Sequence, residues 1–324
     1  MNYSSEILEK VNHAIAAMEY PAKPEGLYEP MRYVLSMGGK RIRPVFLLLA
    51  YSMYDSDINK AMNAALGIEA YHNYTLLHDD LMDRADVRRG QPTVHRKWDA
   101  NTAILSGDSM LVLSCKLMLS VTSSHTREIM NLFVKTALEI GEGQQYDMNF
   151  ERRLDVTEAE YIEMIRLKTS VLVACAVQMG AILGGATDDD ARLLYSFGEK
   201  IGLAFQLQDD YLDVYGNPEV FGKRIGGDIL CNKKTFLLIN ALQRADINQQ
   251  AQLVGWLGRD EYVADVKIQA VTDLYNALGI RELCEQRISQ YFDEAQHYLD
   301  QVSLPAQVKQ PLASFAASLV NREN

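Results

Sequence analysis

The sequence of 324 residues predicts an all-α fold, and three observations support this prediction. Apolar residues recur at i, i+3, i+4 and i+7 along most of the chain, which is the spacing of one helix face. No segment combines two-residue alternation with the turn pairs of a β-hairpin. No proline occurs between Pro92 and Pro218, so helices in that interval can run uninterrupted. We therefore expect roughly ten or more helices.

Two stretches show the helical pattern most clearly. An apolar stripe recurs in 105–119, and in 158–183 most residues after Lys168 are apolar or small. The second stretch predicts a helix that is buried on nearly every side. None of the breaks between helices resembles a flexible linker, so we expect one all-α domain over 1–324. The breaks are expected near 21–26, 36–40, 54–58, 84–93, 121–125, 147–156, 184–188, 215–227, 256–261 and 301–306.

The composition is that of a soluble globular protein with an acidic balance. Hydrophobic residues make up 48% of the chain, charged residues make up 23%, and the formal net charge is −11. This charge argues against nucleic acid and anionic membranes as partners. We find no membrane span of about 18 apolar residues and no signal-peptide pattern at the N-terminus. Four cysteines lie far apart, which predicts no zinc site or disulfide framework and fits a cytoplasmic protein: Cys115, Cys175, Cys231 and Cys284.

Two apolar helical stretches, 74–83 and 204–213, end in the same acidic pattern of Asp-Asp-x-x-Asp. The first and last carboxylates of each pattern share a helix face, one turn apart. Negative charge at a helix C-terminus opposes the helix dipole, so a bound cation explains the clusters better than a solvated surface does. Oxygen ligands without histidine or thiolate favour Mg²⁺ over zinc. The carboxylates are Asp79, Asp80 and Asp83 in the first cluster and Asp209, Asp210 and Asp213 in the second.

Basic residues accompany both clusters and are suited to holding phosphate oxygens. They occur in SMGGKRIRP (36–44), at Arg88 and Arg89, at Lys168, and in GKRIGGDILCNKKT (222–235). Lys168 begins an apolar stretch, where an unpaired ammonium would be costly. For three others a solvated surface charge is the expected role: Arg41, Arg224 and Lys234.

In combination, these motifs resemble the trans-isoprenyl diphosphate synthases of the polyprenyl synthetase family. The resemblance rests on GGKRIRP, HDDLMD followed by RRG, KT, and FQLQDDYLD followed by GK and KKT, in order from about residue 26 to 240. It implies an isoprenoid synthase fold around a central cavity and a homodimer. It also implies that isopentenyl diphosphate is condensed with an allylic diphosphate, which is dimethylallyl, geranyl or farnesyl diphosphate.

The resemblance also assigns roles to single residues. Asp79, Asp83 and Asp209 would ligate three Mg²⁺ ions, for which Mn²⁺ can substitute, while Asp213, Asp80 and Asp210 would support them. The allylic diphosphate would be held by Arg88, Lys168, Lys223 and Lys233. Isopentenyl diphosphate would be bound by Lys40, Arg43, His72 and Arg89. Thr169 and Gln206 would flank the reacting carbons. Small departures from the family pattern occur at Met37, at Gly227 and at Asn232, where glycine is common before the lysine.

The length of the product is expected to depend on Tyr74, five residues before Asp79. An aromatic ring at this position would limit the growing chain, as in short-chain members of the family, and small Thr75 favours a product one unit longer than farnesyl. We therefore expect C20 geranylgeranyl diphosphate, with C15 farnesyl diphosphate next. The alternative is that Tyr74 packs in the core and a residue near 105–113 sets the limit.

Other functions are weaker explanations of the same residues. A longer-chain polyprenyl synthase shares every motif. A terpene cyclase would not need the isopentenyl-binding residues, and its second metal motif normally differs from DDYLD. A di-iron carboxylate bundle would use EAYH (69–72) and EAQH (294–297) but leaves the aspartate clusters unexplained. An inactive partner subunit usually lacks aspartates that are all present here.

Overall fold

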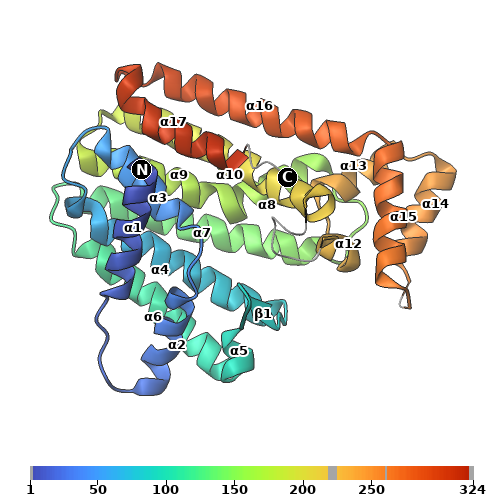
Figure 1. The fold of residues 1–324 in the computed structure, drawn as a ribbon, viewed down its shortest axis with the longest axis horizontal. Coiled ribbons are helices and arrows are strands. Elements are labelled where there is room, and N and C mark those ends of the chain that lie inside the picture. The colour runs from blue at the N-terminus through green and yellow to red at the C-terminus, as the bar shows by residue number, and fades with distance from the viewer. Residues whose placement is uncertain (1–2, 218–224, 260, 321–324) are drawn as a thin grey trace. The chain divides into compact units, whose positions relative to one another are not determined.

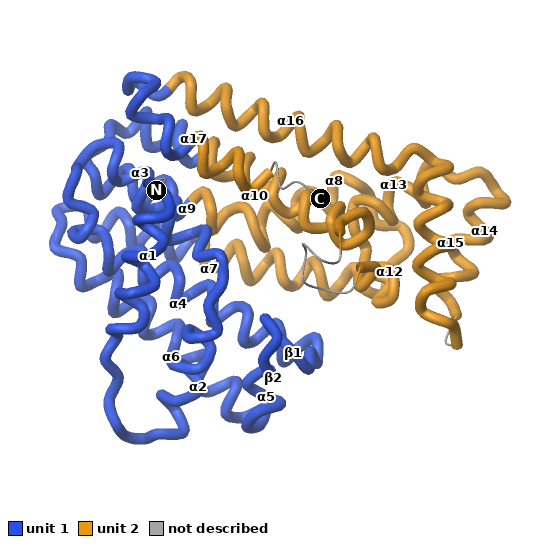
Figure 2. Tube along the Cα trace, in the orientation of Figure 1, with its two compact units in different colours: residues 1–135, 175–195, 302–312 blue, residues 136–174, 196–301, 313–324 orange. Residues whose placement is uncertain are grey.

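The computed structural model describes residues 3–217, 225–259 and 261–320. It forms two compact units, each built from three segments of the chain (Figures 1 and 2). Helices account for nearly all of the described secondary structure, which confirms the all-α prediction. Unit 1 comprises 1–135, 175–195 and 302–312, and unit 2 comprises 136–174, 196–301 and 313–324. The prediction of a single domain stays a prediction.

Unit 1 is organised around the buried helix α3 and the long helix α4. Eight consecutive residues of α3, from Pro44 to Tyr51, are buried. Gly67 lets α4 approach α6 closely, because a Cβ there would lie 2.9 Å from the Met118 side chain. The elements are α1 (Tyr3–Ala16), α2 (Glu25–Ser36), α3 (Ile42–Ser52), α4 (Asn59–Met82), β1 (Val87–Arg88), β2 (Gln91–Pro92), α5 (Val94–Lys97) and α6 (Ala100–Leu119). Unit 1 also contains the start of α7 (Thr126–Phe150), most of α9 (Val171–Gly184), and the starts of α10 (Asp188–Tyr215) and α17 (Ala306–Val320).

Unit 2 has its own apolar core, to which α8, α10, α13 and the C-terminal helices contribute. Close backbone contacts again depend on glycine, since a Cβ at Gly202 would lie 2.5 Å from the Cα of Ser170. The elements that lie wholly in unit 2 are α8 (Glu158–Ile165), the π-helix η1 (Arg166–Ser170), α12 (Gly227–Leu230), α13 (Phe236–Arg244), α14 (Ile247–Leu257), α15 (Ala264–Ala277) and α16 (Ile280–Gln301).

The structure differs from the predicted helices in two places. The stretch 158–183 is not one regular helix, because the π-helical turn at Arg166–Ser170 separates α8 from α9. The break at 84–93 contains a two-stranded antiparallel pair, β1 and β2, in which Val87 pairs with Pro92. Arg89 and Gly90 turn the chain between them, both at positive φ. So short a pair carries too few alternating residues to be seen in the sequence.

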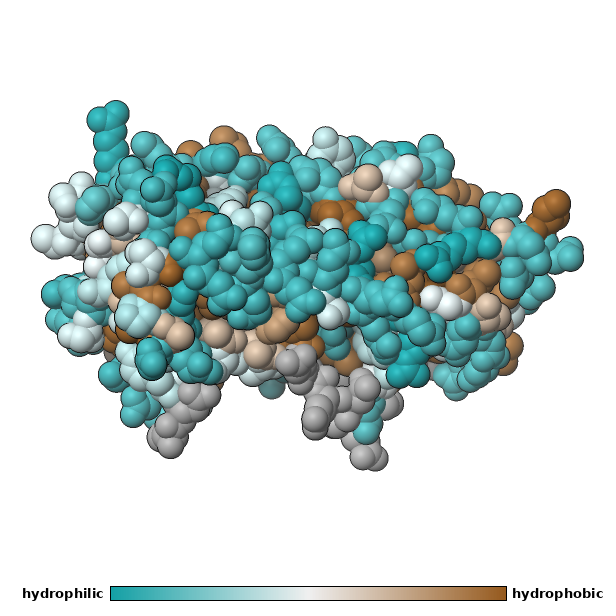
Figure 3. All heavy atoms as spheres, turned by 90° about the horizontal axis from the view of Figure 1, so that it is seen from above, coloured by the Kyte–Doolittle hydropathy of each residue, from teal (hydrophilic) through white to brown (hydrophobic). Residues whose placement is uncertain are grey.

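Among the residues that the structure describes, two helical stretches are long and apolar enough to cross a membrane by length and composition alone. In the most apolar 18-residue window of 158–184, 72% is buried within the protein, as in a core helix, whereas the corresponding window of α6 is 33% buried. Hydrophilic residues predominate on the face drawn in Figure 3, with apolar residues scattered among them. The expected absence of a membrane span stays a prediction.

Candidate active site

The first acidic cluster lies at the C-terminal end of α4. Asp79 is partly exposed and Asp83, the residue that caps the helix, is exposed. Asp80 is buried and accepts two hydrogen bonds of 2.8 Å from Nε of Arg88, one on each carboxylate oxygen. Burial raises the pKa of Asp80, although the Arg88 guanidinium opposes this. Asp80 therefore holds Arg88 beside the two more exposed carboxylates.

The Gly-Gly turn before Lys40 forms a seat for the guanidinium of Arg89. Nη1 of Arg89 donates to the carbonyl of Gly38, and a Cβ at Gly39 would lie 2.7 Å from Cζ of Arg89. Both glycines have positive φ, which other residues adopt only with strain. Lys40 follows the turn and is exposed. Glycine at these positions thus lets an arginine lie directly against the backbone.

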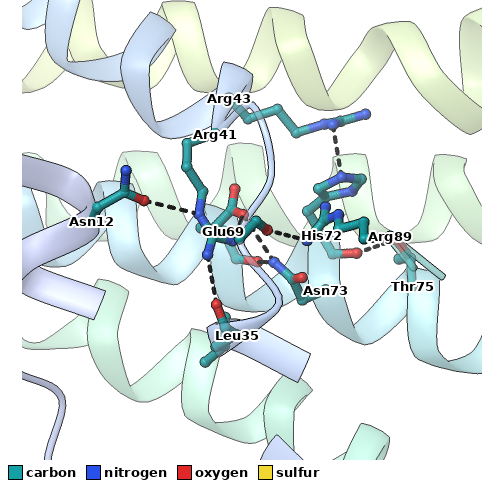
Figure 4. Close-up of polar contacts among 10 residues, drawn as sticks. Asn12, Leu35, Arg41, Arg43, Glu69, His72, Asn73, Thr75 and Arg89 are labelled. Atoms are coloured by element: carbon teal, nitrogen blue, oxygen red, sulfur yellow. Dashed lines mark hydrogen bonds and ion pairs between the residues drawn. The ribbon is translucent and has the colours of Figure 1, made fainter. Parts of the chain in front are cut away.

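His72 on α4 lies among arginines (Figure 4). Its Nε2 is 3.0 Å from Nη1 of Arg43. Burial lowers the pKa of His72 well below its ordinary value, and the charges of Arg43, Arg89, Arg88 and Arg41 lower it further. The ring is therefore neutral, and its Nε2 accepts the hydrogen bond from Arg43. The structure thus brings together the predicted residues Arg43 and His72.

Arg41 was expected to be a solvated surface charge, and this prediction is wrong. Its side chain is buried and its Nη1 lies 2.6 Å from a carboxylate oxygen of Glu69 (Figure 4). The guanidinium also donates to the Leu35 carbonyl at 2.5 Å and to the side-chain oxygen of Asn12 at 3.4 Å. Glu69 accepts a second hydrogen bond, of 2.9 Å, from Asn73. The sequence could not show this, because the partners come from three other helices.

The same ion pair removes support from the di-iron alternative. The glutamate of EAYH is Glu69, whose carboxylate is neutralised by Arg41. The glutamate of EAQH is Glu294, whose carboxylate lies 2.6 Å from Nζ of Lys200. Each glutamate thus serves as the anion of an ion pair, and Glu69 lies deep in the protein.

Tyr74 lies on α4 between two aromatic neighbours one turn away on either side. Its ring centroid is 5.4 Å from that of Tyr71 and 4.8 Å from that of His78. The ring is only partly buried. The hydroxyl of Thr75 donates to the carbonyl of His72 at 2.8 Å and so is directed along the helix. The Tyr74 ring therefore packs against Tyr71 and His78 along α4.

The second acidic cluster lies near the C-terminal end of α10, and its middle carboxylate, Asp210, has neutral hydrogen-bond partners. Asp210 is buried and accepts hydrogen bonds from the hydroxyl of Tyr161 and, at 3.1 Å, from Nε2 of Gln206. The hydroxyl of Thr169 donates to Oε1 of the same Gln206 at 3.1 Å. The predicted residues Thr169 and Gln206 are therefore in contact, while Asp209 is partly exposed beside them. Sequence reasoning missed Tyr161.

The charges in this part of unit 2 depend on one another. Burial raises the pKa of Asp210 to about 7; Lys233 opposes this change and Asp228 adds to it. Burial alone would lower the pKa of Lys233, but Asp228, Asp210, Asp147 and Asp213 together raise it above its ordinary value. Nζ of Lys233 is 3.7 Å from Asp228, and its side chain is still 42% exposed. Lys233 is therefore a solvent-accessible cation in an acidic environment.

Lys168 is part of the π-helix η1 and points toward α7. Its Nζ lies 2.6 Å from Oδ2 of Asp147. The two helices touch through their backbones, since a Cβ at Gly143 would lie 2.4 Å from the backbone nitrogen of Lys168. This partner explains how an ammonium can begin an apolar stretch. Asp147 was missed, because no motif links it to a lysine 21 residues later.

Asp213, the last carboxylate of the second cluster, contacts the start of α12. Its Oδ2 accepts a hydrogen bond of 2.8 Å from the backbone N–H of Asp228, in the first turn of α12. One carboxylate oxygen of Asp213 is thus used in a contact with the backbone, and Asp213 is less exposed than Asp83 of the first cluster.

Lys234 was also expected to be a solvated surface charge, and this prediction too is wrong. Its side chain is buried, and Nζ donates to the backbone carbonyls of Asn232 at 3.0 Å and Glu151 at 3.5 Å. A lysine can end on carbonyl groups supplied by the fold, which local sequence does not reveal. The predicted residues Lys223 and Arg224 lie outside the residues that the structure describes.

Comparison with known proteins decides the family. A model of the polyprenyl synthetase family matches residues 24–274, more than two thirds of the chain. The chain belongs to the polyprenyl synthetase family. Membership makes this protein a trans-prenyltransferase, as the motifs predicted.

Individual relatives agree with this assignment. The chain is 43% identical over 249 residues to a geranylgeranyl diphosphate synthase of Methanosarcina mazei, covering 75% of this chain and 77% of that protein. It is 36% identical over 336 residues to a geranylfarnesyl diphosphate synthase of Natronomonas pharaonis, covering 98% and 96%.

Solved structures of the family have the same fold. A geranylgeranyl pyrophosphate synthase superposes with a TM-score of 0.95 at 40% identity over 100% of both chains. Another, from Corynebacterium glutamicum and complexed with isoprenyl diphosphate and magnesium, gives a TM-score of 0.84 at 29% identity, covering 99% of this chain and 96% of that one. The isoprenoid synthase fold expected from the sequence is thereby confirmed.

Proposed function

We propose that this prenyltransferase condenses isopentenyl diphosphate with an allylic diphosphate, with Mg²⁺ as cofactor, to form C20 geranylgeranyl diphosphate. The observation that carries the proposal is the pair of helix ends, on α4 and α10, that each present partly exposed aspartates with cations held beside them. Several of the similar proteins are named for C20 products and some for C25 products.

The aspartates fit the chemistry of Mg²⁺. Asp79, Asp83 and Asp209 would supply carboxylate oxygens, the donors that this ion prefers. In the part of the chain that the structure describes, no group of three or more His, Cys, Asp or Glu side chains could hold a metal by itself. This fits an ion that completes its shell with water and substrate phosphate. Three ions, and replacement by Mn²⁺, are part of the proposal. When bound, the metal would neutralise charge on the leaving diphosphate.

The cations divide between two diphosphates in this proposal. Arg88 and Lys168, each oriented by a carboxylate of its own, would hold the allylic diphosphate together with Lys233. Lys223 is assigned to the same group by its motif. Around the Gly-Gly turn, Lys40, Arg43, His72 and Arg89 would bind isopentenyl diphosphate. Neutral His72 can donate or accept a hydrogen bond there without adding charge.

The reaction requires charge stabilisation more than acid–base chemistry. The bond between C1 and oxygen of the allylic diphosphate breaks, and the double bond of isopentenyl diphosphate attacks C1. A proton then leaves the condensed product for the departed diphosphate. Oxygen dipoles on Thr169 and Gln206, which hydrogen-bond to each other, would stabilise the allylic cation. An apolar cavity would keep water from it.

Product analysis with the enzyme, Mg²⁺ and isopentenyl diphosphate tests the proposal, using C5, C10 and C15 allylic diphosphates in turn. A C20 product is expected. Tyr74→Ala should lengthen the product by one or more isoprene units if the Tyr74 ring limits the chain. Tyr74→Phe keeps the ring and should leave the product unchanged. An unchanged distribution in Tyr74→Ala would place the limit elsewhere, near 105–113.

A homodimer is part of the proposal and is supported by an apolar face of α6. Leu105, Val112 and Leu119 recur every seven residues and are 59%, 68% and 60% exposed. Ile104 and Val134 are exposed as well. Exposed apolar residues in such a row are typical of a protein interface. Light scattering should give twice the 36.5 kDa chain mass, and Val112→Glu should shift the population toward monomer. A monomeric wild-type enzyme would contradict this part of the proposal.

A further inference from the structure

Lys267 on α15 is a fully buried lysine with no part in the chemistry described so far. Its Nζ donates to the side-chain oxygen of Asn232 at 2.7 Å and lies 4.3 Å from the ring centroid of Tyr262. Burying an ammonium group is costly, and a neutral amide and an aromatic ring compensate for this less well than a carboxylate would. The ammonium group of Lys267 therefore depends on its contact with Asn232.

Asn232 is held in an unusual backbone conformation by contacts of its side-chain amide and of its backbone. It has a φ of 54°, in the left-handed region that glycine favours and asparagine tolerates. Its side-chain oxygen accepts from Lys267, and its side-chain nitrogen donates to the Leu257 carbonyl at 3.1 Å. Its backbone carbonyl accepts from Nζ of Lys234 at 3.0 Å. Its backbone N–H donates to the Ile229 carbonyl at 3.2 Å. Where glycine would adopt this turn freely, the present chain fixes it with these four contacts.

Lys233 directly follows Asn232, so the backbone of Asn232 sets the direction of its side chain. The Lys233 N–H donates to the Asp228 carbonyl at 3.0 Å, and its Nζ lies 3.7 Å from the carboxylate of the same residue. Lys233, Asn232 and Lys267 line one cavity, together with apolar residues of α14 and α15. The buried ammonium and the exposed one are thus coupled through a single residue.

We propose that Lys267 is a positioning residue, which acts through Asn232 to direct Lys233 toward the allylic diphosphate. This inference rests on the proposed function, in which Lys233 binds that diphosphate. Without the Lys267 contact, Asn232 can relax to an ordinary backbone conformation and turn Lys233 away. The site for isopentenyl diphosphate, in unit 1, does not depend on this contact.

Steady-state kinetics of Lys267→Met, with both substrates varied, tests the inference. The KM for the allylic diphosphate should rise about ten-fold, while the KM for isopentenyl diphosphate stays unchanged. Lys267→Gln keeps an N–H donor and should restore part of the loss. Lys309→Met is the matched control, because Lys309 is also buried but ends on the Val302 carbonyl in unit 1, so neither KM should change.

Two further variants keep the test decisive if Lys267→Met folds poorly. Asn232→Ala should raise the allylic KM more than Asn232→Gly, because alanine resists the positive φ and glycine adopts it. Equal effects of these two variants on the allylic KM would overturn the inference but not the proposed function. The same conclusion would follow if Lys233→Ala raised the allylic KM and Lys267→Met left it unchanged. An unchanged allylic KM in Lys233→Ala would overturn the role of Lys233 in the proposed function, and the inference with it.

Discussion

Asp80 and Asp210 occupy the same position in two copies of one motif, yet the protein satisfies their carboxylates differently. Asp80 lies against a guanidinium that contacts both of its oxygens. Asp210 is as deeply buried but accepts from the neutral side chains of Tyr161 and Gln206. Burial raises its pKa to about 7, against the opposing charge of Lys233. One motif can thus be built into a fold through an ion pair or through neutral hydrogen bonds.

The two clusters differ in how their middle carboxylates are held, but the first aspartate of each cluster should be equally important for turnover. We expect Asp79→Ala and Asp209→Ala each to lower turnover roughly a thousand-fold or more, because each removes a proposed metal ligand. Helix content measured by circular dichroism should stay unchanged. Asp86→Ala, which breaks only an exposed pair with Arg96, is the matched control and should keep near-normal activity. Full activity in excess chelator would contradict the metal proposal for both clusters.

Replacing each middle carboxylate, Asp80 or Asp210, by its amide should lower the free energy of unfolding by different amounts. Asp80→Asn leaves the Arg88 guanidinium without its anion, and we expect the free energy of unfolding to fall by about 2 kcal/mol. Asp210→Asn keeps a hydrogen-bond acceptor for the neutral partners Tyr161 and Gln206 and leaves no ion pair broken between them, so a loss under about 1 kcal/mol is expected. Denaturant unfolding without substrate or metal measures both. Equal losses would mean that the guanidinium and the neutral donors stabilise the carboxylates equally.

The pH dependence of stability tests the arginine-rich surroundings of His72. Its pKa in the folded protein lies well below the ordinary value of about 6.5, which applies to the unfolded chain. Below that pH the unfolded state binds the extra proton, so the free energy of unfolding falls as pH decreases, by up to about 1.4 kcal/mol per pH unit. In His72→Gln the fall in the free energy of unfolding that comes from His72 should be missing between pH 6.5 and 5.5. An identical pH slope in both proteins would show that His72 becomes protonated in the folded state.

The sequence indicated candidate site residues more readily than the residues that support them. The aspartates, Thr169 and Gln206 could be proposed because each lies in a motif of fixed local spacing. Tyr161 and Asp147 could not, since they meet Asp210 and Lys168 only through the fold. Arg41 and Lys234 were misjudged for the same reason: whether a cation is solvated depends on which helices cover it. Local pattern identifies a chemical group, and tertiary contacts decide its charge and orientation.

The π-helical turn at Arg166–Ser170 has a consequence for insertions and deletions in this chain. The N–H of Val171 donates to the carbonyl of Arg166, five residues earlier, so the turn contains one residue more than an α-helix would. Deleting one residue from this turn would rotate the following helix, α9, by about 100° relative to α8. Lys168 and Thr169 would then no longer both reach Asp147 and Gln206. The number of residues between Ile165 and Val171 therefore sets the directions of the Lys168 and Thr169 side chains.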